Sequence, residues 1–203
     1  MTLQDITHLL EQEACAVRNI PIIPAYEEAV NLIVSHVHGR GGTLITSGMG
    51  KAGQVAVNVS TTFSSTGTPS YFLHPSEAQH GDLGILRPND VLLLISNSGK
   101  TRELIELLAL SRGIVPSIPS IAITSNPDSP IGREATFCLP TGAPTEVCPL
   151  GLTPTTSTTV MMVIGDILVV NTMHRIGFSN DDYALRHHGG YLGQKSRSHG
   201  GNG

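Results

Sequence analysis

Residues 90–101 read DVLLLISNSGKT, and this stretch decides the fold. Residues 90–95 are almost wholly apolar, which is the pattern of a strand buried on both faces of a sheet. Small and hydroxyl-bearing residues follow, and residues 101–111 then show a helical pattern. A strand that leads through such a turn into a helix is the repeating unit of parallel sheets.

A second loop has the same surroundings. Residues 47–53 read SGMGKAG, and they lie between strand-forming residues 43–46 and a helical pattern at residues 52–64. In both loops small residues allow a ligand to approach the backbone, and the first amides of the next helix point at an anion. The two loops therefore predict a phosphate-binding site. Its predicted members are Ser47, Gly48, Gly50, Ser96, Asn97, Ser98 and Thr101.

Neither loop matches a common nucleotide-binding pattern. A P-loop requires G-x-x-x-x-G-K-[ST], which neither loop contains, and the G-x-G at Gly48 has no acidic residue placed to read a ribose. A nucleotide site is thus the weaker interpretation. Glycines that only form tight turns remain an alternative for either loop taken alone.

Strand and helix patterns alternate along the chain. Strands are predicted at residues 43–46, 69–73, 90–95, 120–124 and 136–139, with helices at 52–64, 101–111 and near Ile131. Helical spacing of apolar residues also predicts two N-terminal helices, at residues 3–18 and 25–37. We expect an α/β three-layer sandwich, doubly wound, in which helices flank a five-stranded parallel sheet. Ligands would then bind at the carboxyl ends of the strands.

Residues 153–159 read TPTTSTT, a segment that could be low-complexity, a strand or a helix start. We expect a helix, because Thr153 can cap it, Pro154 suits its first position, and residues 160–174 continue apolar. Five hydroxyls in the first turns of a helix are unusual unless a polar group lies beside them.

Length and composition indicate one globular domain. The chain has 203 residues, 39% hydrophobic and 14% charged, so we expect a single domain at residues 1–195 and a disordered tail at 196–203. The net charge of −4 argues against a nucleic-acid partner. Three cysteines without C-x-x-C spacing suggest neither disulfides nor a structural zinc site. With no signal peptide and no apolar run near ~18 residues, we expect a cytoplasmic protein without membrane contact.

Three segments carry candidate catalytic side chains. Glu103 follows the second loop, where stabilisation by the helix dipole is the commoner explanation of a carboxylate. Glu146 lies among apolar residues next to Pro149, where a raised pKa suited to proton transfer is expected. His187 and His188 end a short helix, either as a solvated cap or as a functional pair.

Several ordered strings resemble one family. They are SGMGK at 47–51, STGTPS at 65–70, HPSEA at 74–78, HGDLG at 80–84, SNSG at 96–99 and CPLGLTP at 148–154. Together with Gly189-Gly190 and Leu192-Gly193, they resemble the sugar isomerase (SIS) domain of D-arabinose 5-phosphate isomerases. The resemblance covers roughly residues 1–195.

The resemblance implies an activity and a set of site residues. The family interconverts D-ribulose 5-phosphate and D-arabinose 5-phosphate, which supplies the eight-carbon acid Kdo for lipopolysaccharide, and it forms homotetramers with active sites shared between subunits. Its active-site lysine corresponds to Lys51, its acidic residues to Glu103 and Glu146, and its histidines to His80 and His187.

Aldose–ketose exchange through an enediol needs a base, a group for the hydroxyl proton and a donor for developing charge. Glu146 is our choice of base, with Glu103 orienting the substrate, although either carboxylate could reach the carbon. His187 would handle the hydroxyl proton or ring opening, and Lys51 would stabilise negative charge. The chemistry requires no cofactor and no metal, and zinc bound by His80 and His187 could block the site.

Two departures and two alternatives accompany this interpretation. Many relatives continue into paired CBS modules, and we expect regulation through such modules to be absent here. Lys100 and His188 stand where well-known relatives have an acidic residue and a proline. One alternative is an isomerase of another phosphosugar, such as a hexulose or heptose phosphate. The other is a non-catalytic sugar-phosphate-binding regulator, which would need a DNA-binding module and could dispense with the proton-transfer groups.

Overall fold

The computed structural model describes residues 2–188 and contains one five-stranded sheet. The strands lie in the order β2-β1-β3-β4-β5, and every neighbouring pair is parallel. Their bounds are β1 Leu44–Gly48, β2 Ser70–Phe72, β3 Val91–Ile95, β4 Ser120–Thr124 and β5 Phe137–Pro140. These are the five strands expected from the sequence, so the prediction of a parallel α/β fold is confirmed.

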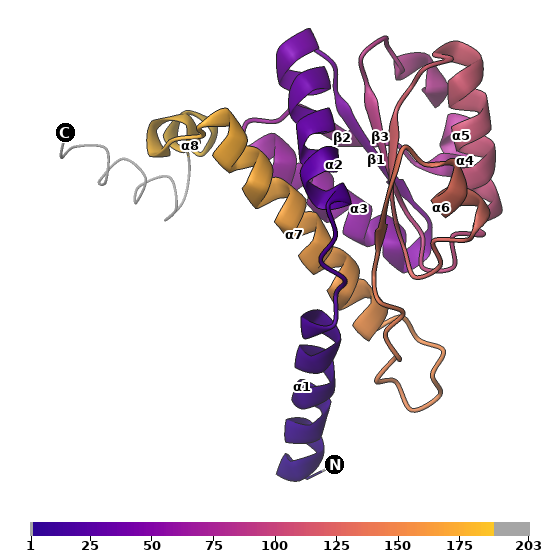
Figure 1. The fold of residues 1–203 in the computed structure, drawn as a ribbon, viewed down its shortest axis with the longest axis vertical. Coiled ribbons are helices and arrows are strands. Elements are labelled where there is room, and N and C mark those ends of the chain that lie inside the picture. The colour runs from indigo at the N-terminus through magenta and orange to yellow at the C-terminus, as the bar shows by residue number, and fades with distance from the viewer. Residues whose placement is uncertain (1, 189–203) are drawn as a thin grey trace.

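The side chains of β3 show why the sheet is covered on both faces. Val91, Leu93 and Ile95 belong to the apolar core under α2 (Ala25–Ile33), α3 (Gly50–Ser65) and α7 (Thr156–Ile176). Leu92 and Leu94 point the other way, into the core under α4 (Pro75–Ala78), α5 (Arg102–Ile114) and α6 (Pro130–Glu134). The result is the expected three-layer sandwich, with the sheet between two sets of helices (Figure 1).

The strand order creates a switch point between β1 and β3. From β1 the chain passes through α3 to β2 on one side, and from β3 it passes through α5 to β4 on the other. The two connections therefore diverge, and they leave a crevice at the carboxyl ends of the two central strands. Both glycine-containing loops begin at this crevice.

The first helix extends away from the domain. Helix α1 (Leu3–Arg18) forms where predicted, but none of its residues is buried, and Leu3 and Leu10 are 84% and 61% exposed. Figure 1 shows it projecting beyond the rest of the chain. The second predicted helix, at residues 25–37, is also present, and its hydrogen bonding changes where α2 passes at Ile33 directly into a π-helical segment, η1 (Val34–His38).

Helix α7 supplies many of the apolar side chains of one helical layer. Its first residue differs from the prediction. It begins at Thr156 with Thr155 in the capping position, so the predicted cap at Thr153 is wrong. By length and composition α7 is the one described helix that could cross a membrane, a result the sequence analysis did not expect. Half of the apolar stretch of α7 is buried inside the domain, with Ile164 and Leu168 in the core. Packing against the sheet therefore accounts for the apolar composition of this helix.

The remaining elements are a 3₁₀ segment, η2 (Asp82–Ile85), and helix α8 (Asn180–Arg186), which follows α7. The predicted tail at 196–203, the domain end at 195 and the Gly189-Gly190 and Leu192-Gly193 motifs lie outside the described residues.

Candidate active site

The loop after β1 brings backbone close to the crevice. Gly50 opens α3 with φ of 57°, a conformation that favours glycine. A Cβ on Gly48 would lie 2.8 Å from the carbonyl oxygen of Ala52, so the strand end and the first helical turn are in close contact. The free amides at the start of α3 are thereby presented at the carboxyl end of β1.

The loop after β3 is organised by its own hydroxyls. Ser96 Oγ accepts a hydrogen bond from the Gly99 amide at 3.1 Å and lies 2.7 Å from Thr101 Oγ1. Ser98 Oγ accepts from the Lys100 amide at 3.2 Å. Gly99 has φ of 63°, which a residue with a Cβ would adopt only under strain. These bonds hold the turn open at the start of α5.

A third helix start completes the cavity. Residues of both loops and of the first turns of α7 line a cavity of about 260 Å³. Its lining is Met49, Lys51, Ala52, Ser96, Asn97, Ser98, Thr101, Pro154, Ser157, Thr158 and Met161. Helices α3, α5 and α7 therefore direct their N-terminal ends, with their free amides and positive partial charges, at one space. Such a space is suited to a phosphate group.

Sequence reasoning missed the contribution of α7 to this cavity. Ser157 and Thr158 line it, although neither was predicted as a site residue. The signal was present, because the run of hydroxyls at the helix start pointed to a polar neighbour. Ser47, by contrast, was predicted as a site residue but does not line the cavity. Its buried hydroxyl donates to the carbonyl of Leu73 at 2.7 Å.

Glu146 lies against the start of α7 and caps it. Its Oε2 accepts hydrogen bonds from the Thr155 amide at 2.7 Å, the Thr155 hydroxyl at 2.9 Å and the Ser157 amide at 3.2 Å. Its Oε1 accepts no hydrogen bond from residues 2–188, and this oxygen is not buried. One oxygen is therefore fixed beside the cavity lining while the other stays accessible.

The pKa of Glu146 differs from the expectation. Burial raises the pKa of this carboxyl, but hydrogen bonds from Ser157 and Thr155 outweigh the burial and hold the pKa below its ordinary value. The prediction of a raised pKa is wrong, because the apolar neighbours in sequence are not the groups that contact the carboxylate. Glu146 is ionised at neutral pH and can accept a proton.

Glu103 and His80 lie at the same end of the sheet, outside the cavity lining. Glu103 is half-buried in the first turn of α5. His80 is exposed just beyond α4, and its neighbour Gln79 donates to Glu106 of α5 at 2.8 Å. The start of α4 contacts one of the residues that line the cavity, since Ser76 Oγ lies 4.0 Å from the sulfur of Met49.

His187 lies far from the cavity in the single chain. It follows α8, and its ring stacks on Tyr183 with 3.7 Å between ring centroids. The 21 residues of α7 separate α8 from Glu146, a helix length of about 30 Å. Figure 1 shows α8 at the end of α7 opposite the loop that carries Glu146. A zinc ion shared by His80 and His187 would therefore need two chains.

Lys51 joins the cavity to a neighbouring groove. The Lys51 side chain is exposed at the start of α3 and lines both the 260 Å³ cavity and a second cavity of about 500 Å³ between α3 and α7. Thr158 likewise lines both. The two spaces therefore meet beside an ammonium group that can approach a bound anion.

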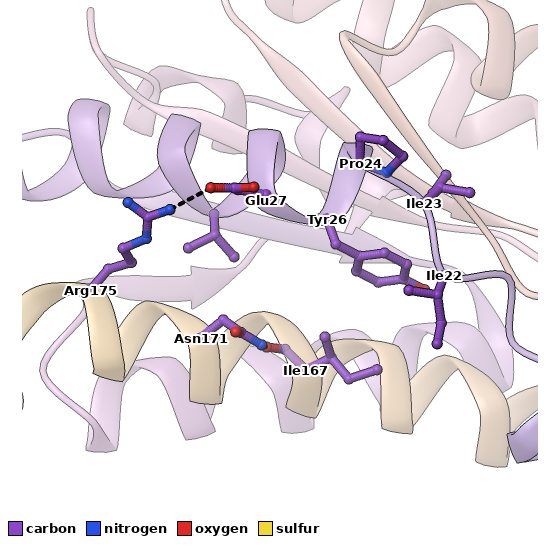
Figure 2. Close-up of a pocket in the computed structure, with 9 residues that line it drawn as sticks. Ile22, Ile23, Pro24, Tyr26, Glu27, Ile167, Asn171 and Arg175 are labelled. Atoms are coloured by element: carbon purple, nitrogen blue, oxygen red, sulfur yellow. Dashed lines mark hydrogen bonds and ion pairs between the residues drawn. The ribbon is translucent and has the colours of Figure 1, made fainter.

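A larger cavity lies elsewhere and contains none of the predicted site residues. It has a volume of about 590 Å³ and lies between α2 and α7. Figure 2 shows the ion pair between Arg175 and Glu27, 2.8 Å apart, and the Tyr26 ring beside Ile22. Ile22 is 96% exposed, so this part of the surface is markedly apolar.

Comparisons with known proteins agree with this architecture. The SIS domain model matches residues 40–171. The arabinose 5-phosphate isomerase KdsD of Yersinia pestis is 46% identical over 154 residues, which make up 76% of this chain and 46% of that protein. The chain spans about half the length of the curated relatives it matches.

Two solved structures align over nearly their whole length. A candidate phosphosugar isomerase from Bacteroides fragilis, described as involved in capsule formation, has a TM-score of 0.92 and 63% identity over 93% of this chain and 98% of that chain. An Escherichia coli CFT073 protein in complex with arabinose 5-phosphate has a TM-score of 0.79 and 32% identity over 91% of this chain and 98% of that chain. The chain therefore belongs to the SIS domain family.

Proposed function

We propose that the protein interconverts D-ribulose 5-phosphate and D-arabinose 5-phosphate. The observation that carries the proposal is the convergence of three helix N-termini on one small cavity, with the accessible oxygen of Glu146 beside it. The cavity suits the phosphate, and the carboxylate suits proton transfer at the other end of the sugar. The relative solved with arabinose 5-phosphate and the relatives named arabinose 5-phosphate isomerase support this substrate.

The reaction moves one proton between neighbouring carbons. Glu146 removes the proton from C2 of the aldose, the carbonyl oxygen at C1 gains a proton, and an enediol forms. The proton then returns to C1 while the C2 hydroxyl loses its own, which yields the ketose without any external oxidant. Lys51 stabilises the developing negative charge, and Glu103 orients the chain of hydroxyls.

The proposal includes a homo-oligomer, a tetramer, in which a second subunit supplies His187. The distance along α7 keeps His187 of the same chain away from Glu146. The exposed apolar residues Leu3 and Leu10 on α1, together with Ile22, supply surface for such an assembly. His187 from a neighbouring subunit would then handle the hydroxyl proton or open the sugar ring.

The proposed product would supply Kdo synthesis, and the proposed location is the cytoplasm. All three cysteines are free thiols, which fits a reducing compartment.

The experiment incubates the purified protein with D-ribulose 5-phosphate in D₂O and follows the products by NMR. The proton that Glu146 holds at the enediol stage can exchange with solvent, so we expect D-arabinose 5-phosphate with deuterium at C2 in part of the product, and no turnover of unphosphorylated D-ribulose. Turnover of a hexulose or heptose phosphate, but not of the pentose phosphate, would replace the substrate. Binding of the pentose phosphate without any exchange would favour a regulator instead.

The shared site has its own test. Lys51→Ala and His187→Ala variants are each expected to be nearly inactive, and mixing the two by co-expression should restore part of the activity. Restoration requires that Lys51 and His187 of one site come from different chains. A mixture that stays as inactive as its parents contradicts the sharing of sites.

A further inference from the structure

Within residues 2–188, helix α1 has one side-chain hydrogen bond to the active-site region, through Glu13. The Thr156 hydroxyl at the start of α7 donates to Glu13 Oε1 at 2.9 Å. The same hydroxyl accepts a hydrogen bond from the amide of Val147, the residue next to Glu146, at 3.1 Å. Thr156 is 1% exposed, so this link lies inside the molecule.

The link and the Glu146 cap hold the same two segments together. Glu146 binds Thr155 and Ser157, and Val147 binds Thr156 between them. The carboxylate and the next amide of the loop are thus fixed to consecutive residues of α7. Thr156 can accept from Val147 in this orientation because its own proton is directed at Glu13.

One oxygen of the partly buried Glu13 side chain costs stability. Its Oε2 is buried and has no hydrogen-bond partner among the described residues. A buried carboxylate oxygen without a partner destabilises a fold, although the positive end of α7 offsets part of that cost. Stability alone therefore does not account for a carboxylate at this position.

We propose that Glu13 is a positioning residue that orients Glu146 through Thr156 and Val147. This inference rests on the proposed isomerase function. Glu13 does not line the cavity, and it acts by fixing the loop from which Glu146 reaches the substrate. It also makes the base dependent on α1, a helix with no buried residue of its own.

The chain offers matched variants for the test. Glu13→Ala removes the acceptor, and Glu13→Gln keeps an oxygen that can accept from Thr156. Glu11→Ala is the control, because Glu11 is an exposed carboxylate on the same helix that lines a surface hollow with other α1 residues only. Thr156→Val and Thr156→Ser repeat the comparison at the middle of the link.

Steady-state kinetics with D-ribulose 5-phosphate give the first measurement. A small displacement of a catalytic group can cost up to about 100-fold, so we expect Glu13→Ala and Thr156→Val to lower kcat by about 10-fold or more. KM should stay within about twofold, because the phosphate cavity is intact. Glu13→Gln, Thr156→Ser and Glu11→Ala should keep most of the activity. The Glu13→Ala/Thr156→Val double variant should be no worse than Thr156→Val, since both break one link.

Hydrogen–deuterium exchange of residues 146–157 gives the second measurement, and it does not depend on activity. Glu13→Ala should speed exchange of this segment while Glu11→Ala leaves it unchanged. Unchanged exchange in Glu13→Ala, or a kcat equal to that of Glu11→Ala, overturns the inference. If the wild-type protein fails to convert the pentose phosphate, the proposed function fails, and the exchange data still decide whether Glu13 orders the loop.

Discussion

Replacing Glu146 by glutamine removes the proposed base with little change of shape. Oε2 of Glu146 accepts three hydrogen bonds at the start of α7, and the oxygen of a glutamine can still accept from the two amides. What is lost is the negative charge at the helix N-terminus. Because the group is partly open to solvent, we expect the free energy of unfolding to fall by only about 1 kcal/mol.

The catalytic effect should be much larger than the structural one. A general base typically contributes about 100- to 10,000-fold, which corresponds to roughly 3–5 kcal/mol in the activation free energy. A loss of about 1 kcal/mol leaves a domain of ordinary stability almost fully folded and lowers Tm by about 2–4 °C. Glu146→Gln should therefore lose at least about 100-fold in kcat while remaining folded.

The assay follows D-arabinose 5-phosphate formation, with thermal denaturation measured on the same samples. Glu103→Gln is the comparison variant, since Glu103 is a second carboxylate near a helix start, in the first turn of α5. A Glu146→Gln variant with a kcat within about threefold of the wild type would refute the choice of base. If Glu103→Gln alone abolishes turnover, the roles of the two carboxylates are exchanged.

Three further substitutions test the cavity and the packing of α7 against α3. Thr155→Val removes a donor to the ionised carboxylate of Glu146, so its pKa rises, and the acid limb of the kcat/KM profile should move to higher pH; an unmoved limb argues that Glu146 does not titrate there. Since the pKa of Glu146 is depressed in the folded protein, its stabilising effect is present at neutral pH and is lost as pH falls through that pKa, and Thr155→Val should weaken it. Ser96→Ala removes the hydroxyl that accepts from the Gly99 amide and pairs with the Thr101 hydroxyl, while the Gly99 amide keeps its bond to the Ser96 carbonyl. We therefore expect a loss of about 0.5–1.5 kcal/mol in stability and a higher KM for the phosphosugar; an unchanged KM contradicts the phosphate assignment. Gly165→Ala places a Cβ against a methyl group of α3, and thermal denaturation should report about 1–3 kcal/mol of overpacking, whereas an unchanged Tm would show that the two helices can separate freely.

The fold was predictable wherever the signal is local. The run at 91–95 reads as a doubly buried strand because both of its faces meet apolar helices, and the loop at 96–101 reads as a helix start because small residues and hydroxyls are required there. The alternation of strands and helices predicted that the sheet is parallel, but it did not predict the order of the strands. The switch point between β1 and β3 became visible in the structure.

The site was predictable in its residue types and less so in its contacts. The start of α7 was misplaced because its cap is not a local residue but the carboxylate of Glu146, nine residues before Thr155. The same contact lowers the pKa of Glu146, whereas its apolar neighbours in the sequence had predicted a raised pKa. The separation of His187 from the cavity depends on the direction of α7, and no sequence pattern reports that direction.

A crystal structure of the protein with D-arabinose 5-phosphate would show which end of the sugar lies beside Glu146. We expect a phosphate within hydrogen-bond distance of Ser96, Ser98 and Thr101, with C1 and C2 facing Oε1 of Glu146. A phosphate bound in the cavity between α2 and α7, or a sugar whose C1 and C2 point away from Glu146 in every subunit, would contradict it.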